Sequence, residues 1–324
     1  MTQKTFPLPL IESTFDAGLD ARLRHKIDNK TKPLGALGQL EALALQIGLI
    51  QRSDTLRFES PQMVANMLAG GAAINVLARQ HGFALQVVDA GVASDLVDHP
   101  NLIKRKMAHG THNLAAGPAM TAHQLNAALQ TGSDVLASLS GNVVAFGEMG
   151  IANTSPAALL LHRLVGVSIE DATGRGTGLN DPQLLHKQAV LFKAAALHAD
   201  ATAPLDALAA LGGFEIAMMT GAMLQAASER RVILVDGFIA GIAALVACAL
   251  APAAKDYMVF CHRSAERGHR LLLAHLKARP LLDLDMRLGE GTGALLAWPM
   301  VQSAALLMNE MASFESAGVS GKEE

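Results

Sequence analysis

Two glutamates in this chain lie between glycines, in two separate segments. The first segment reads Gly147-Glu148-Met149-Gly150, and the second reads Leu288-Gly289-Glu290-Gly291-Thr292-Gly293. Glycine lets the backbone turn sharply and approach a ligand closely. A carboxylate held in such a loop can accept a proton or an N–H group from a ligand, and buried surroundings tune its pKa. The two segments therefore indicate a small-molecule enzyme with a carboxylate as its base.

A third glycine-rich segment is suited to a phosphate group. It reads Thr173-Gly174-Arg175-Gly176-Thr177-Gly178-Leu179-Asn180 and leads into a predicted helix that starts at Asp181. Exposed backbone N–H groups at a helix N-terminus favour an anion. No Gly-Lys-Ser/Thr follows, so the segment is not a P-loop for ATP or GTP. Lys187, six residues after Asp181, is a candidate charge partner for the phosphate.

The elements that must position these loops alternate between strands and helices. Apolar strand-like runs lie at 85–89, 142–146, 232–235 and 257–261. Helical patterns lie between or beside them, at 62–79, 155–164, 181–198, 213–230, 238–250 and 264–276. Continuous apolar strands are typical of a parallel sheet that is covered on both faces. The sequence therefore predicts an α/β fold with a Rossmann-like, doubly wound parallel sheet and helices on both faces.

A polar residue directly follows each predicted strand. These residues are Asp89, Glu148, Asp236 and His262. Ligands of open parallel sheets bind outside the carboxyl ends of the strands, so the four side chains are expected to line one crevice. The alternative is that some of them only cap the following helix. Ser264, two residues after His262, is likewise a candidate helix cap or a donor to a ligand.

The two ends of the chain are predicted to be helical. Residues 13–50 carry helical patterns, and 292–316 form one long helical pattern with apolar spacing. We expect the terminal segments, 1–55 and 292–324, to pack together as a small helical subdomain. The large α/β domain is then 56–291 and contains the crevice.

Composition excludes several classes of protein. Of the 324 residues, 51% are hydrophobic and 17% charged, and the net charge of −3 argues against disorder and against a nucleic-acid partner. The basic run Lys104-Arg105-Lys106 is expected to be solvated surface. Cys248 and Cys261 lie in apolar runs and favour reduced thiols in a cytoplasmic protein, with a disulfide as the weaker alternative.

No membrane segment is expected. Residues 237–254 are uncharged and largely apolar, but Asp236 precedes them and they are rich in Ala and Gly. This pattern favours a helix buried in an α/β core over a membrane span. The N-terminus, Met1-Thr2-Gln3-Lys4, is not followed by the apolar region of a signal peptide.

Taken together, the segments resemble the nicotinate-nucleotide–dimethylbenzimidazole phosphoribosyltransferases, the CobT enzymes of cobalamin assembly. The resemblance runs through most of the chain. It is carried by residues 30–38, 70–75, 113–120, 147–155, 174–181, 211–216, 236–239, 262–266 and 288–294.

The resemblance implies a reaction. A ring nitrogen of 5,6-dimethylbenzimidazole attacks the ribose C1′ of nicotinate mononucleotide, nicotinate leaves, and α-ribazole 5′-phosphate forms with inversion. The pyridinium leaving group is already cationic and needs no acid. The benzimidazole must lose its other N–H proton, so one base suffices. By the resemblance that base is Glu290; the other interpretation is a structural glutamate that caps the helix near Thr292.

The resemblance also implies a set of substrate-binding residues. The loop that holds the nucleotide, together with a residue after the N-terminal helices, contributes Glu148, Met149, Gly150, Asn153 and Gln62. Positions near the ribose phosphate are Thr154, Gly176, Lys187 and Ser264. Apolar walls for the flat base would be Met149 and Leu288. Neither a metal nor a cofactor is expected, and similar enzymes are homodimers.

One departure from the family pattern is large. Residues 51–60 run almost directly into Pro61-Gln62-Met63-Val64. A further strand and its loop, about two dozen residues, are absent here, and losing a central strand would leave backbone donors unpaired. A smaller departure is Ala152, where the family commonly has glycine.

Three explanations of the missing segment near residues 54–61 stay open. The chain is a truncated paralogue with altered base specificity, at the extreme a catalytically impaired protein that only binds the nucleotide. Alternatively the deletion is engineered, or the sequence lacks a segment that the protein contains. An NAD-dependent oxidoreductase would also suit an α/β fold, but no Gly-x-Gly-x-x-Gly follows the first predicted strand.

Overall fold

The centre of the fold is one parallel sheet. The computed structural model describes residues 6–30, 39–56, 72–96, 98–176, 179–313 and 316–317, and the backbone of 62–65. In these residues six strands are ordered β3-β2-β1-β4-β5-β6, and every neighbouring pair is parallel. The strands are β1 (Gln62–Ala65), β2 (Ala84–Asp89), β3 (Leu102–Lys104), β4 (Val143–Phe146), β5 (Val232–Val235) and β6 (Met258–Phe260).

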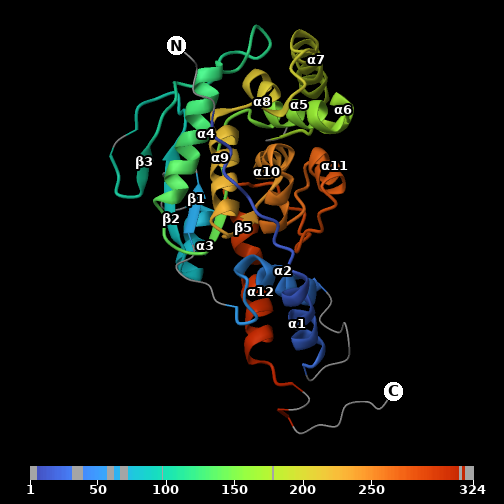
Figure 1. The fold of residues 1–324 in the computed structure, drawn as a ribbon. Coiled ribbons are helices and arrows are strands. Elements are labelled where there is room, and N and C mark those ends of the chain that lie inside the picture. The colour runs from blue at the N-terminus through green and yellow to red at the C-terminus, as the bar shows by residue number, and fades with distance from the viewer. Residues whose placement is uncertain are drawn as a thin grey trace.

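The strand order reverses between β1 and β4, as in dinucleotide-binding Rossmann folds. Right-handed connections then place helices on both faces. On one face α9 (Phe214–Ser228) packs against both α4 (Ala122–Ala137) and α10 (Phe238–Leu250), and on the other α3 (Ala73–His81) packs against α12 (Thr292–Glu310) (Figure 1). The predicted doubly wound α/β fold is confirmed.

The central strands and α10 are buried throughout. Every residue of β4 and β5 is buried, as expected for strands covered by helices on both sides. Ten of the thirteen residues of α10 are buried, so the apolar stretch 237–254 contains a core helix followed by a 3₁₀ turn, η1 (Pro252–Tyr257). No helix in the described part of the chain is long and apolar enough to cross a membrane.

The predicted helix over 62–79 is wrong in its first part. Gln62–Ala65 is a strand, and the helix begins only at Ala73. Met and Ala are good helix formers, but β1 pairs with β2 on one side and with β4 on the other. The backbone groups on the facing edges of those two strands need a partner between them, and this tertiary requirement overrides local propensity. In this chain the residues that follow the interruption form the strand between β2 and β4.

Most other elements agree with the predicted ones, and some were missed. The remaining agreeing helices are α5 (Thr154–Val165), α7 (Asp181–Leu197) and α11 (Arg267–His275). Elements without a prediction are β3, α4, α6 (Ile169–Ala172) and α8 (Pro204–Leu211). β3 is only three residues long and partly exposed, so its sequence has no continuous apolar run that would predict a strand.

Helices from both termini pack together at the lower end of the molecule in Figure 1. α1 (Ala17–Asp28) packs against α2 (Gln39–Gln51), and α2 packs against α12. α12 also contacts α3 and β4, so it belongs to both parts, and a separate terminal subdomain stays a prediction. Of the segments that carry the family resemblance, residues 31–38, 70–71 and 177–178 lie outside the described residues.

Candidate active site

Three of the four predicted strand-end residues come together. Glu148, Asp236 and His262 follow β4, β5 and β6, which are neighbours in the sheet. Asp89 is the last residue of β2, on the far side of β1, where its carboxylate pairs with Lys106 (Nζ–Oδ2 3.0 Å). Asp89 therefore anchors a loop. Lys104 and Arg105 are exposed, as predicted for the basic run, but the Lys106 side chain is only 18% exposed, so the prediction is wrong for this residue.

The two glycine-flanked glutamate loops touch each other. The backbone N–H of Glu290 donates to the carbonyl of Glu148 at 3.1 Å. Gly147 packs so closely on the backbone of Glu290 and Gly291 that a Cβ atom there would overlap it. Gly147 is thus required because the backbone of the Glu290 loop comes so close to it. Both glutamates lie at one end of the sheet.

Glu290 is held in an unusual backbone conformation. Gly289, Glu290 and Gly291 have φ values of 81°, 65° and 82°, all in the left-handed region. This region costs a residue with a Cβ roughly 1–2 kcal/mol. Such strain persists where surrounding structure over-determines it, and it clusters at functional sites.

The carboxyl group of Glu290 is set up to take a proton. Burial, and secondly the negative charge of Asp236, raise its pKa above the ordinary value. Glu290 as a whole is only 8% exposed. A general base works best when its pKa lies near the working pH, so this shift is in the useful direction.

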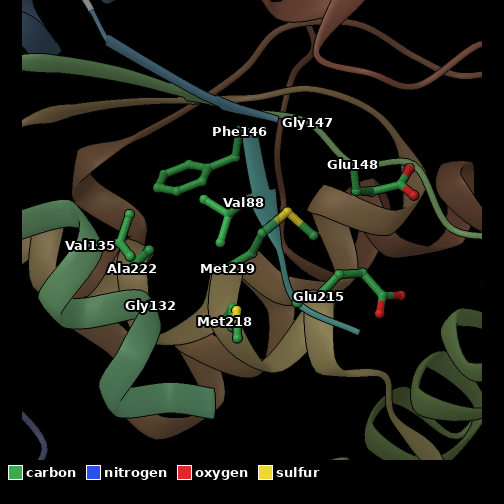
Figure 2. A pocket seen from close by; sticks show the side chains of 11 residues that line it. Val88, Gly132, Val135, Phe146, Gly147, Glu148, Glu215, Met218, Met219 and Ala222 are labelled. Atoms are coloured by element: carbon green, nitrogen blue, oxygen red, sulfur yellow. The ribbon is translucent and has the colours of Figure 1, made fainter. Parts of the chain in front are cut away.

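A second pair of carboxyl groups lies beside a small cavity of about 40 Å³. Glu148 and Glu215, in the first turn of α9, line it together with the apolar side chains of Phe146, Val88 and Met219 (Figure 2). Burial raises the pKa of Glu148 to about 8, and burial also raises the pKa of Glu215. Glu148 is therefore protonated at neutral pH.

Asn153 joins these two carboxyl groups. Its side-chain amide donates to Glu148 and also hydrogen-bonds Glu215. Glu215 was not among the site residues predicted from the sequence. Unlike the other two glutamates, Glu215 is separated from the preceding Gly212-Gly213 pair by Phe214 and is not followed by a glycine, so the sequence pattern did not mark it.

A wider cleft opens next to the cavity. Glu215 lines both, and the cleft is also lined by the loop that runs from Met149 to Asn153 and by Lys187. Large apolar side chains stand exposed near the two glutamates: Met149, Ile151 and Leu288 are 49%, 92% and 56% exposed. Exposed apolar side chains beside polar groups are typical of a binding surface for a flat, partly apolar ligand.

Lys187 lines the cleft and contacts two other segments. Its ammonium group donates to Thr154 Oγ1 at 2.9 Å and to the carbonyl of Gly174 at 3.4 Å. Gly176 lies against the Thr154 side chain. Burial lowers the pKa of Lys187, and the nearby carboxylate of Glu266 opposes that shift. The structure thus brings three predicted phosphate-site residues together.

Ser264 reaches this cluster through Glu266. The Ser264 hydroxyl accepts from the backbone N–H of Glu266 at 3.3 Å, and the Glu266 carboxylate packs against Gly174. Gln62, the remaining candidate, begins β1, and its side chain lies outside the described part of the chain.

The N-terminus of α5 faces the same cluster. α5 starts at Thr154, and its N-cap residue Asn153 makes no side-chain cap, since its amide is used on the carboxyl groups. The first turn of an uncapped helix presents N–H donors and the positive end of the helix dipole. Beside Lys187, this is a suitable arrangement for a phosphate.

Comparisons with known proteins identify the family. The family model described as "Phosphoribosyltransferase" matches residues 13–62 and 57–319. A protein of Variovorax paradoxus named nicotinate-nucleotide–dimethylbenzimidazole phosphoribosyltransferase is 53% identical over 348 aligned positions, covering all of both chains. This chain belongs to that family. A member from Cupriavidus necator with the same name is 55% identical, covering 94% of this chain and 96% of the relative.

A solved structure of the same family has the same fold. The crystal structure of CobT from Thermus thermophilus superposes with a TM-score of 0.89 at 37% identity, covering 94% of this chain and 99% of that one. The phosphoribosyltransferase family resemblance found in the sequence is therefore confirmed.

The family comparison also locates the missing segment. The family model matches in two pieces that meet at 57–62, where the sequence departs from the family pattern. The alignment with the Variovorax protein has 348 positions against 324 residues in this chain, a difference of 24. The chain therefore lacks a segment of the family, and the interruption falls directly ahead of β1.

Proposed function

We propose that this protein transfers the 5-phosphoribosyl group of nicotinate mononucleotide to 5,6-dimethylbenzimidazole, which gives α-ribazole 5′-phosphate and nicotinate for the lower ligand of cobalamin. The observation that carries the proposal is the arrangement of the cleft. Glu290, whose pKa is raised, lies in a loop that contacts the Glu148 loop, and Lys187 lines the cleft beside the N-terminus of α5.

The chemistry needs one base and one anion site. A benzimidazole nitrogen forms a bond to C1′ while the bond from C1′ to the nicotinate nitrogen breaks, and the electron pair of that bond stays on nicotinate. The second ring nitrogen of the benzimidazole gives its proton to Glu290. Raised proton affinity at Glu290 supports this role, because the acceptor must hold the proton that the cationic product sheds.

The phosphate is proposed to lie at the N-terminus of α5, between Lys187, Thr154 and Gly176. The charge of Lys187 and the helix N–H groups favour an anion there. Ser264 borders this site. The nucleotide itself lies along Glu148, Met149, Gly150 and Asn153, with Gln62 near the base.

Met149 and Leu288 are proposed as the apolar walls for the aromatic base. Both are about half exposed, so covering them with a flat ring removes apolar surface from water. Because Glu148 is protonated at neutral pH, it can donate a hydrogen bond to a ligand rather than repel an anionic one.

A cytoplasmic homodimer is the proposed state of the protein. Cys248 and Cys261 are both free, which suits a reducing compartment. α7, which borders the cleft, exposes Leu185, Phe192 and Leu197, an apolar surface suited to a second copy. Light scattering after gel filtration would give the mass of a dimer; a monomer at micromolar concentration would contradict it.

The deciding experiment is a two-substrate assay with intact mass on the same sample. Nicotinate mononucleotide and 5,6-dimethylbenzimidazole are mixed with the protein, and both products are followed by chromatography. Product from a protein whose mass matches the 324-residue chain supports the transferase and shows that the missing segment is dispensable. Binding of the nucleotide without turnover would favour the impaired paralogue, to which the family relationship gives no support.

A further inference from the structure

α12, the helix that follows Glu290, is capped from another part of the chain. Its N-cap residue Gly291 has no side chain to offer. Asp236, at the end of β5, takes that place: its Oδ2 accepts from the N–H of Gly291 at 3.0 Å and its Oδ1 from the N–H of Ala294 at 3.1 Å. One carboxylate thus holds the residue directly after Glu290 and the first turn of α12.

Asp236 is itself held by His262. Both residues are almost fully buried, at 3% and 2% exposure, and His262 Nε2 lies 3.6 Å from Asp236 Oδ1. The imidazole also packs so tightly on Gly293 that no Cβ would fit there. Burial raises the pKa of Asp236, and His262 opposes that shift. The histidine therefore favours the ionised carboxylate, which is the form that accepts from two N–H groups.

The remaining ionisable groups near Asp236 cannot take over this role. His269, next to His262, accepts the Ser264 N–H at its Nδ1, and burial lowers its pKa to about 3, so it stays neutral. Glu148 and Glu290 are carboxyl groups, and Cys261 is a buried thiol whose pKa is raised. His262 alone among these neighbours can stabilise a negative charge on Asp236.

We propose that Asp236, held by His262, is the positioning residue for Glu290: its two carboxylate oxygens keep the Glu290 loop in the left-handed conformation that presents the base to the substrate. The loop is fixed on its other side by the carbonyl of Glu148. Asp236 itself is too deeply buried to touch the substrate. This inference deepens the proposed function and rests on Glu290 acting as the base.

The test compares Asp236→Asn with Asp16→Asn. Both remove a charge from a helix cap, but Asp16 caps α1, where it accepts from the N–H of Leu19 at 2.8 Å. Asp236→Asn places an NH₂ group opposite a backbone donor. We expect kcat to fall about ten- to a hundredfold, as for a misplaced catalytic group, with little change in KM for nicotinate mononucleotide. The acid limb of the kcat–pH profile should move to lower pH, because the charge that raises the Glu290 pKa is gone. Asp16→Asn should lower only thermal stability.

A purely structural role for Asp236 predicts another result. Asp236→Asn would then lose stability as Asp16→Asn does, with kcat and the pH profile of the wild type, and the proposal would be overturned. If Asp236→Asn does not fold, the milder His262→Gln decides: a fall in kcat and a shifted acid limb support the proposal, and wild-type values overturn it.

A double-mutant cycle separates this inference from the proposed function. If Asp236 acts through Glu290, Asp236→Asn should lower kcat no further in a Glu290→Gln background. Fully additive losses would show that Asp236 acts by another route. A wild-type protein that makes no product refutes the proposed function instead, and a Glu290→Gln variant with full turnover refutes only the base.

Discussion

The proposed role of Glu290 depends on its backbone conformation as well as on its carboxyl group. A left-handed φ of 65° is one that Gly and Asn adopt readily and that glutamate rarely does. The neighbouring glycines and the hydrogen bond to Glu148 keep it there. The conformation of the loop therefore helps to set where the carboxyl group of Glu290 lies relative to the substrate.

Glu290→Gln keeps the size of the side chain and removes the base. We expect kcat to fall about 10²- to 10⁴-fold, the usual contribution of a positioned general base. KM for nicotinate mononucleotide should change little, since the nucleotide contacts lie on other loops. Steady-state kinetics measure both. Unchanged turnover would remove Glu290 from its role.

Lys187→Ala should mainly weaken nucleotide binding. A hydrogen bond to a charged group contributes about 1.5–3 kcal/mol, so the Kd should rise roughly ten- to a hundredfold. Lys193→Ala is the matched control, because Lys193 is an exposed lysine on the same helix. Calorimetric titration gives both affinities. Equal affinities in the two variants would show that Lys187 is only a surface charge.

At this scale the sequence predicts what local patterns encode. Glu148, Glu290 and Lys187 were predicted because glycines or a predicted helix start mark them. Glu215 and the pairing of Asp236 with His262 depend on which strands are neighbours and on how α9 and α12 begin. That information is tertiary, and no local spacing contains it.

At the scale of elements, β1 is the informative case. Residues 62–65 were predicted to be helical, and yet they occupy the centre of the sheet. The long runs around β4 and β5 were correctly predicted, because their continuous apolar character is unambiguous. A four-residue strand such as β1 is too short to show such a pattern. Its extended conformation depends on backbone hydrogen bonding to β2 on one side and to β4 on the other.

Val64→Pro tests whether β1 is central. Proline removes the N–H group of residue 64. Because β1 is paired with β2 on one side and with β4 on the other, a hydrogen bond to one of these strands is lost in either case. We expect a clear loss of unfolding free energy in urea. Val64→Ala, which keeps the N–H, serves as the control. If the two variants are equally stable, Val64 does not lie in a central ladder.

At the scale of the molecule, one end of the sheet concentrates carboxyl groups whose pKa values are raised. Glu148, Glu215, Asp236 and Glu290 all belong to this group, with burial as the first cause in each. Each binds its proton more tightly in the folded protein than in the unfolded chain. Their stability contribution is full below the unfolded pKa and is lost as the pH rises through the folded pKa.

Glu148→Gln isolates one member of this set. Well below pH 4.5 the wild-type side chain is neutral in both the folded and the unfolded state, so the stabilities of the wild type and the variant should depend on pH in the same way there. Between about 4.5 and 8 the wild type loses stability relative to the variant, since ionisation of Glu148 is opposed in the folded state. Urea unfolding across this range measures the difference. If the difference in unfolding free energy between the two proteins stays constant with pH, or grows in favour of the wild type, the pKa of Glu148 is not raised.

The order of synthesis gives α12 a further consequence. All six strands precede residue 261, whereas the Glu290 loop and the helix that it opens come after them. The sheet is therefore synthesised before the base and its helix. The face that α12 covers stays open until α12 has been made, so nascent chains that end before Glu290 should have a nucleotide site but no turnover.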